Sequence, residues 1–589
     1  MAARDSIMRK PKDTRGTFRR MVSYLGPFRY LMLLIFALCI LSNLLSLLGP
    51  NLAGSAINEA AAGKGKVNFD KVSYFAMRML ICYVASSLLT ISIHMLMVRI
   101  SKTVANRLRQ DVFNKLMVLP VGYFDRHQSG DIISRVSYDI DVISTCMATD
   151  VVSILTSLVT VIGSLVMMIS ISLPLSAVAL ITVPASILYT TRMRKITQPR
   201  FAKRSKNYGI MNGFVEEMLS GQKTIQAYAY ENRVDEKFDH INTDAAQAYY
   251  DADSYGVTIG PTMGFINNLG LSLIAMFGSI LYMSGLIGLG SISSFVLYSR
   301  KFSGPINEIA NIINELFSAL AAAERVFTLL DEKEEVADRE NARELRDAKG
   351  NVELSHVSFG YDPGRTILHD LSLRADSGKL IAIVGPTGAG KTTIINLLMR
   401  FYDVDSGQIL VDDVDHRDYT RRSLRGAYAM VLQDTWVFQG TIFDNIAYGK
   451  ENATMEEVVA AAKAAHIHPF IMRLPDGYQT VIHEDGGNIS KGQKQLMTIA
   501  RAILYDARML ILDEATSNVD TSTEREIQRA MRDLMKDKTC FVIAHRLSTI
   551  QNADRILVLN HGDVVEQGTH DTLMKARGFY YQLYHAQFE

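Results

Sequence analysis

Four long stretches without a charged residue dominate the first half of the chain, at residues 30–58, 79–98, 151–191 and 254–299. A helix needs about 20 apolar residues to cross a bilayer. The first two stretches are therefore long enough for one span each, and the last two for two spans each. The pattern predicts a membrane domain with six spans, which are placed at about residues 30–49, 76–98, 147–171, 174–194, 256–284 and 288–316.

The distribution of Lys and Arg predicts how these spans are oriented. The first 20 residues carry seven of them, and the segments 99–150 and 192–253 are rich in charge. Cytoplasmic loops attract such residues, so both segments and the N-terminus are expected in the cytoplasm. Lys64, Lys66 and Lys71 run against this orientation, but the opposite one would place the second half of the chain outside the cell. Both segments should be helical extensions of the spans, because long structureless loops are rare in compact domains.

The pattern changes after residue 330. Residues 331–350 are highly charged and predict a linker. From residue 352, short runs of β-forming residues alternate with helical ones, which is typical of an α/β domain with a largely parallel sheet. The expected organisation is a transmembrane domain over 1–330, the linker 331–350 and an α/β domain over 351–589.

Composition excludes some classes of protein. The 589 residues carry a net charge of +1, so no basic surface for nucleic acid is expected. The four cysteines, Cys39, Cys82, Cys146 and Cys540, lie far apart, which argues against a disulfide framework. The first apolar stretch is also too long for a cleaved signal peptide.

A glycine-rich sequence between an apolar strand and an amphipathic helix carries the clearest chemistry. Gly385–Thr392 reads GPTGAGKT and fits the phosphate-loop pattern G-x-x-x-x-G-K-[ST]. Its backbone N–H groups should surround phosphates at a helix N-terminus. Lys391 should reach the β- and γ-phosphates, and the Thr392 hydroxyl should bind Mg²⁺. This sequence predicts a site for a nucleoside triphosphate.

Two further strands end in residues that suit the same site. The run RMLILDEATS places Asp513 and Glu514 at a strand end. Asp513 suits the Mg²⁺ shell, and Glu514 suits either a general base or a residue that positions the attacking water. The run TCFVIAH ends in His545. Because ligands bind at the carboxyl ends of parallel strands, this histidine is expected to face the site.

The order of these motifs resembles that of ATP-binding cassette (ABC) transporters, and specifically an exporter half-transporter of the multidrug or lipid type. The resemblance implies ATP and Mg²⁺ as ligands, and it implies roles for particular residues. Tyr361 would stack on adenine, Gln433 would contact Mg²⁺ and couple to the membrane domain, and Glu484 would contact that domain. The implied nucleotide-binding residues are Tyr361, Gly385, Pro386, Thr387, Gly388, Ala389, Gly390, Lys391, Thr392, Thr393, Ser490, Gly492, Gln493 and Asp520. The implied Mg²⁺ ligands are Thr392, Gln433 and Asp513, and the implied catalytic residues are Glu514, His545 and Gln433.

The resemblance also implies a dimer. In this family the phosphate loop of one domain and the signature sequence of the other hold each ATP between them. The signature here is ISKGQ, in which Ser490, Gly492 and Gln493 match and Lys491 replaces a glycine. The loop before it has His483, Asp485 and Gly486 where Gly, Arg and Gly are commoner, and the loop after Glu514 has Asn518 and Val519 in place of Ala and Leu. Such clustered changes favour a heterodimer, in which this chain supplies the phosphate loop, Glu514 and His545 of the competent site. Neutral drift in a homodimer is the alternative.

The expected function is ATP-driven export of hydrophobic or amphipathic substrates, drugs or lipids, across the bacterial cytoplasmic membrane. A lipid flippase, a peptide exporter or a siderophore importer on the same fold are alternatives, and a channel-like relative remains formally open. A soluble ABC ATPase of DNA repair or translation would require that the spans be misread. Polar residues within or next to the spans, namely His94, Asn267, Asn268, Arg300 and Lys301, are the candidates for contact with cargo.

Overall fold

The computed structural model describes residues 13–63, 66–432, 435–483, 488–513, 521–544 and 547–588. The chain divides into two compact units. The first comprises Met1–Leu119 and His127–Glu334, and the second comprises Pro120–Arg126 and Glu335–Glu589. The short helix α5 (Val121–Arg126) therefore belongs with the second unit, although its neighbours in the chain belong to the first.

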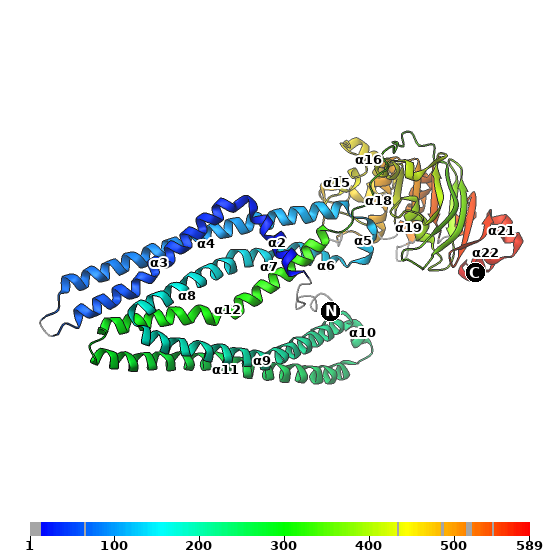
Figure 1. The fold of residues 1–589 in the computed structure, drawn as a ribbon. Coiled ribbons are helices and arrows are strands. Elements are labelled where there is room, and N and C mark those ends of the chain that lie inside the picture. The colour runs from blue at the N-terminus through cyan, green and yellow to red at the C-terminus, as the bar shows by residue number, and fades with distance from the viewer. Residues whose placement is uncertain are drawn as a thin grey trace. The chain divides into compact units, whose positions relative to one another are not determined.

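The first unit consists of long helices (Figure 1). Helix boundaries fall inside both of the longest uncharged stretches, at Ser172 and between Met283 and Leu289, where the sequence predicts turns. The helices of this unit are α2 (Thr14–Leu25), α3 (Arg29–Ala60), α4 (Phe69–Val118), α6 (Ser129–Ser134), α7 (Ile140–Thr145), α8 (Val151–Ile171), α9 (Leu173–Ser220), α10 (Gln222–Ala227), α11 (Glu231–Met283) and α12 (Leu289–Leu330), with a 3₁₀ turn at Gly26–Phe28 and two π-helical turns at Arg135–Asp139 and Cys146–Asp150.

Five helical segments of the described chain are long and apolar enough to cross a membrane. They are Thr14–Ala60, Phe69–Val118, Ser129–Ile171, Leu173–Ser220 and Glu231–Met283. The sixth predicted span, 288–316, falls in α12, which is helical but is not among these five. The sixth span is thus not confirmed as a membrane crossing.

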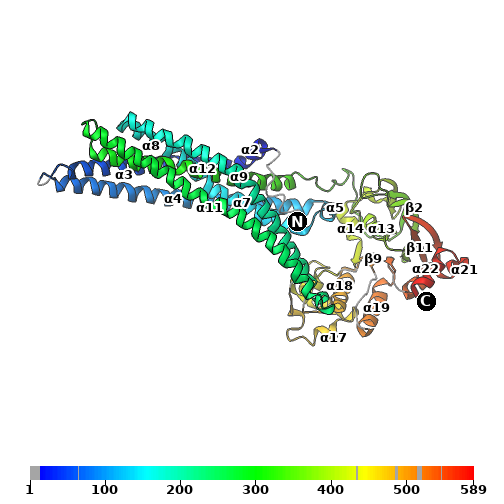
Figure 2. The same ribbon diagram turned by 90° about the horizontal axis from the view of Figure 1, so that it is seen from below.

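Two helical groups form within the first unit. Helices α3, α4, α8 and α12 pack against one another, and the buried side chains of Leu47, Met168, Phe295 and Tyr298 lie between them. Helices α9 and α11 form a long antiparallel pair joined through α10, and they run side by side in both views (Figures 1 and 2). This pair contacts the rest of its unit mainly where α11 meets α12.

The second unit is built on a six-stranded sheet in the order β12-β11-β3-β10-β9-β6. Its strands β11, β3, β10, β9 and β6 are parallel, and β12 is antiparallel to β11. A second, antiparallel sheet has the order β2-β1-β4-β5. The strands are β1 (Val352–Phe359), β2 (Leu368–Ala375), β3 (Leu380–Val384), β4 (Ser406–Val411), β5 (Val414–Asp415), β6 (Tyr428–Val431), β7 (Gly440–Thr441), β8 (Val481–Ile482), β9 (Met509–Asp513), β10 (Thr539–Ile543), β11 (Arg555–Asn560) and β12 (Asp563–Gly568).

The central strand β3 explains why this domain needs apolar residues on both faces of the sheet. Ile381 and Ile383 lie in one buried core, and Ala382 and Val384 lie in the other. Uninterrupted apolar strands are typical of parallel sheets covered on both sides. The covering helices are α13 (Lys391–Leu398), α14 (Arg421–Gly426), α15 (Ile442–Ala447), α16 (Met455–Ala464), α17 (His468–Ile471), α18 (Lys491–Tyr505), α19 (Thr521–Met535), α20 (Leu547–Gln551), α21 (His570–Ala576) and α22 (Phe579–Phe588).

Candidate nucleotide site

The phosphate loop joins the carboxyl end of β3 to the first turn of α13. Gly390, the last loop residue, has φ +99°, and a Cβ there would lie 2.7 Å from Leu368 Cδ2. Only glycine combines this backbone conformation with so little space. The first N–H groups of α13 have no carbonyl partner within the helix, as at every helix N-terminus. The loop is therefore shaped to present backbone donors to an anion.

Lys391 lies over this loop. Its Nζ donates to the carbonyl oxygens of Gly385 at 2.8 Å and Pro386 at 2.9 Å. Burial lowers the pKa of Lys391, and the nearby Asp513 carboxylate opposes that shift. A phosphate bound in the loop would favour the charged ammonium, because an opposite charge at short range stabilises it. The ammonium is thus held where the β- and γ-phosphates are expected.

Asp513 lies at the same edge of the sheet as the phosphate loop. It ends β9 and pairs with Ile543 of β10, which in turn pairs with Ile383, two residues before Gly385. The Thr392 hydroxyl belongs to the first turn of α13 and is exposed. Carboxylate and hydroxyl oxygens are the ligands that Mg²⁺ prefers. The two residues therefore fit a Mg²⁺ ion, whose chemistry would be to neutralise charge on the phosphates.

Tyr361 is placed by contacts with the helix that follows the phosphate loop. Its hydroxyl donates to Thr393 Oγ1 at 3.3 Å and accepts from Asn396 Nδ2 at 2.9 Å. The residue is 41% exposed. The structure thus places Tyr361 against α13, the helix that begins at Lys391 of the phosphate loop.

Sequence reasoning missed Tyr402, which supports the Tyr361 ring. The two rings meet edge to face, with centroids 4.9 Å apart. The Tyr402 hydroxyl donates to Asp125 of α5 at 2.5 Å. Burial and this carboxylate raise the pKa of Tyr402 above its usual range. No local pattern marks such a residue, because Asp125 lies far from it in the chain and only the fold joins them.

The signature sequence begins helix α18. Ser490 is its N-cap, and its hydroxyl accepts from the Gln493 N–H at 3.3 Å, while Gln493 Oε1 accepts from the Ser490 N–H at 2.9 Å. This reciprocal capping box fixes the helix start. Gly492 is buried, whereas Lys491 is exposed. The lysine therefore replaces glycine where the domain has room for a side chain.

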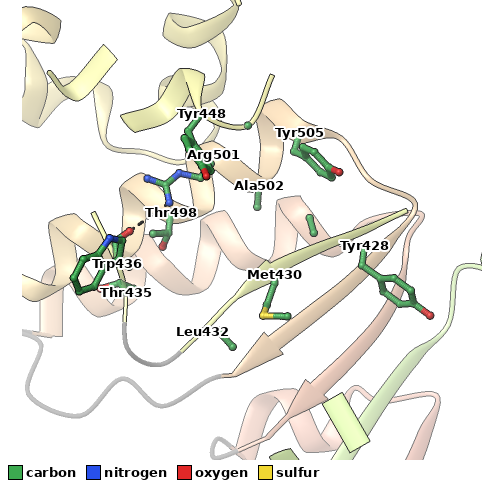
Figure 3. Close-up of a pocket in the computed structure, with 12 residues that line it drawn as sticks. Tyr428, Met430, Leu432, Thr435, Trp436, Tyr448, Thr498, Arg501, Ala502 and Tyr505 are labelled. Atoms are coloured by element: carbon green, nitrogen blue, oxygen red, sulfur yellow. Dashed lines mark hydrogen bonds between the residues drawn. The ribbon is translucent and has the colours of Figure 1, made fainter. Parts of the chain in front are cut away.

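A cavity of about 300 Å³ lies between β6 and α18 (Figure 3). Arg501 crosses one side of it. Its guanidinium donates to the carbonyl oxygens of Asn445 at 2.8 Å and Trp436 at 3.3 Å, and it lies against the Tyr448 ring at 5.3 Å. Burial lowers the pKa of Arg501. The cavity thus flanks the segment after β6 that leads to Gln433.

Several of the predicted site residues fall outside the described parts of the chain, and they remain predictions. These are Gln433, Glu484, Asp485, Gly486, Glu514, Asn518, Val519, Asp520 and His545. The described residues on either side, Leu432, Asp513 and Ala544, lie at or just beyond the carboxyl ends of neighbouring parallel strands.

Comparison with known proteins gives consistent matches over nearly the whole chain. Residues 32–306 match the family described as ABC transporter transmembrane region, and residues 368–517 match the ABC transporter family. An uncharacterized ABC transporter ATP-binding protein of Bacillus subtilis, YfiC, is 43% identical over 98% of this chain and 96% of its own length. A fatty acid ABC transporter ATP-binding/permease protein of Mycobacterium bovis is 46% identical over 88% of this chain and 82% of its own.

A solved structure agrees with this assignment. A bacterial Atm1-family ABC exporter with ATP bound superposes with a TM-score of 0.75 and 29% identity, over 98% of this chain and 99% of that one. The membrane region and the nucleotide domain thus occur in the same order in relatives of nearly equal length. The chain belongs to the ABC transporter family and is an exporter-type half-transporter, a multi-pass membrane protein whose second domain hydrolyses ATP.

Proposed function

We propose that this protein exports hydrophobic or amphipathic molecules, lipids or drugs, across the bacterial cytoplasmic membrane, with its N-terminus and ATPase domain in the cytoplasm. The observation that carries this proposal is the arrangement at the carboxyl ends of β3 and β9. There the phosphate loop, Lys391 and Asp513 lie at the same edge of the sheet. The same chain also contains long apolar helices. A nucleotide site and a membrane region in one chain are what an ATP-driven pump requires.

Each group at the site has a separate task in the proposed reaction. The phosphate loop and Lys391 hold and orient the triphosphate, and Tyr361 holds the base. Thr392, Asp513 and Gln433 would hold Mg²⁺. Glu514 would accept the proton of the attacking water, and His545 would contact the γ-phosphate. Positioning and charge stabilisation account for most of the rate enhancement in phosphoryl transfer.

The second ATP-binding surface comes from a partner chain. We favour a heterodimer, in which a partner supplies the signature that faces this chain's phosphate loop. The altered signature of this chain, with Lys491 exposed at the start of α18, would then serve the partner's own, weaker site. A homodimer is the alternative, in which Lys491 is a neutral change at both sites.

The assembly is tested by measuring ATPase activity of the purified chain alone and together with its candidate partner. Robust activity from a stable homodimer would reject the heterodimer. In either assembly Glu514→Gln should remove nearly all turnover, and survival of half the activity would show that the partner's site is also active. Glu526→Gln, the same change at an exposed position of α19, is the matched control and should leave turnover unchanged.

The class of cargo is tested by transport into inverted membrane vesicles. The mycobacterial relative described as a fatty acid transporter makes fatty acids and other single-chain lipids the first candidates. Accumulation of a labelled fatty acid that requires ATP and stops in Glu514→Gln would support lipid export. Movement only from the outer to the inner face of right-side-out membranes would instead indicate import, and transbilayer movement without release would indicate a flippase.

A further inference from the structure

A proline lies inside α3, the first long apolar helix, and leaves a break in its backbone hydrogen bonding on the side that contacts α12. Pro50 is buried inside α3 and has no backbone N–H, so the carbonyl of Ser46, four residues earlier, loses its helical partner. Gly49 precedes it, and a Cβ there would collide with the Tyr83 ring of α4. Within a bilayer an unsatisfied carbonyl costs several kcal/mol, so such a break needs donors from another helix.

Helix α12 supplies donors to this carbonyl and to the nearby carbonyls of Leu47 and Pro50. Ser294 Oγ donates to the Pro50 carbonyl at 2.7 Å, and the Tyr298 hydroxyl donates to the Leu47 carbonyl at 2.5 Å. One turn further along α12, Lys301 Nζ donates to the Ser46 carbonyl at 3.0 Å and to Ser46 Oγ at 2.5 Å. Ser294 and Tyr298 are almost fully buried, whereas Lys301 is only half-buried.

Lys301 differs from the other two donors because it carries a charge. A hydroxyl suffices to satisfy a carbonyl, as Tyr298 and Ser294 demonstrate a few residues away. Within the described residues, the partners of the Lys301 ammonium are the two oxygens of Ser46 and, at 5.9 Å, the Tyr83 ring, all of which are neutral. Among the side chains that the structure describes, which do not include Glu308, no ion pair joins Lys301 to a carboxylate. An ammonium in a low-dielectric region attracts an anion far more strongly than it does in water.

We propose that the Lys301 ammonium and the Ser46 hydroxyl bind the carboxylate head of an amphipathic cargo, with Tyr83 beside it. An ammonium has three N–H donors, and two of them go to Ser46, which leaves one to point at a carboxylate oxygen. The Ser46 hydroxyl can turn its proton toward the second oxygen. The exposed fractions of Lys301 and Tyr83 leave the site open to a ligand. This inference rests on the proposed export of amphipathic molecules and specifies the head group.

The test separates the charge of Lys301 from its capping of the α3 break. Lys301→Gln removes the charge but keeps a side-chain donor for the Ser46 carbonyl. Lys301→Arg keeps the charge. Arg300→Gln removes the neighbouring positive charge on an exposed part of α12, which the sequence also made a candidate for cargo contact. The proposed site does not include Arg300, so this variant tests which of the two charges acts. The full protein, with any partner, is reconstituted in nanodiscs, and its ATPase is titrated with oleic acid and with methyl oleate.

The wild type should respond to oleic acid at about tenfold lower concentration than to methyl oleate, the factor that one charge-assisted hydrogen bond provides. Lys301→Gln should abolish this difference, and both Lys301→Arg and Arg300→Gln should keep it. If Lys301→Gln does not fold, as judged by size exclusion and thermal unfolding, the responses to oleic acid and methyl oleate are compared in Lys301→Met and Ser46→Ala instead.

Four results would overturn the site. The first is a Lys301→Gln protein that still prefers the acid, and the second is an Arg300→Gln protein that loses the preference. The third is an equal response of the wild type to oleic acid and methyl oleate. This result would reject the carboxylate site but would remain compatible with export of amphipathic molecules. A response to neither lipid would reject the site together with the fatty-acid cargo of the proposed function.

Discussion

The phosphate loop and the Pro50 break both leave backbone groups without a hydrogen-bond partner, donors in the first case and an acceptor in the second. At the start of α13 the chain leaves backbone N–H groups without partners, and at Pro50 in α3 it leaves a carbonyl without one. The loop lies at an edge of a sheet and is partly exposed, so a phosphate can reach its donors. The break lies in an apolar helix, where side chains of α12 must satisfy it. A missing backbone partner thus serves anion binding in the loop and helix packing at Pro50.

The largest effect is expected at Lys391 in the phosphate loop. Lys391→Met should lower ATPase activity by at least about 100-fold, since removal of one preorganised donor to a developing charge commonly costs that much. Steady-state ATPase of the reconstituted protein measures this. Lys379→Met is the matched control, because that lysine pairs with Asp554 at the opposite end of β3. A comparable loss in the control would show that the assay reports stability instead.

The next effect tests the gap at Pro50 in α3. Tyr298→Phe leaves the Leu47 carbonyl without its side-chain donor and should destabilise the fold by about 1–3 kcal/mol. The cost should fall in a Pro50→Ala background, because without the proline ring α3 can straighten and the Asn51 N–H can approach the Leu47 carbonyl. Thermal unfolding in nanodiscs measures both values. Equal costs in the two backgrounds would mean that Tyr298 acts independently of the proline.

Arg501 also donates side-chain hydrogen bonds to backbone carbonyls, in the nucleotide domain. Its guanidinium satisfies carbonyls of Trp436 and Asn445 beside a cavity of about 300 Å³ that water can enter. Arg501→Met should therefore cost only about 1 kcal/mol, because water replaces much of what is lost. Denaturant unfolding monitored at Trp436 measures this. A cost above that of Tyr298→Phe would contradict the proposed role of the solvent.

The smallest effect is expected at the signature. Lys491 is exposed at the first position of α18, so Lys491→Ala should change unfolding free energy by no more than about 0.5 kcal/mol. Ser490→Ala, which removes the N-cap, should cost about 1 kcal/mol in the same assay. A larger effect of Lys491→Ala would show that the lysine makes a contact within its own domain.

Much of the nucleotide site was predictable because phosphate binding depends on local geometry. Gly390 must adopt a positive φ, Lys391 must follow it, and both lie in one short sequence. The order of motifs likewise predicted an exporter-type transporter, and the comparisons confirm it. Residues such as Tyr402 and Asp125 could not be found in this way, since their contact joins segments separated by 277 positions. The assembly with a partner depends on a surface outside a single chain.

The sequence alone determined the apolar helices, the phosphate loop and the type of transporter, because each follows from a contiguous pattern of residues. It also marked Lys301 as an unusual charge beside an apolar run. Only the tertiary structure showed that Lys301, Tyr298 and Ser294 line up on the Pro50 break of α3, more than 240 residues earlier in the chain. The physical reason is that a proline creates its missing hydrogen bond locally, whereas the donors that replace it come from whichever helix the fold places alongside.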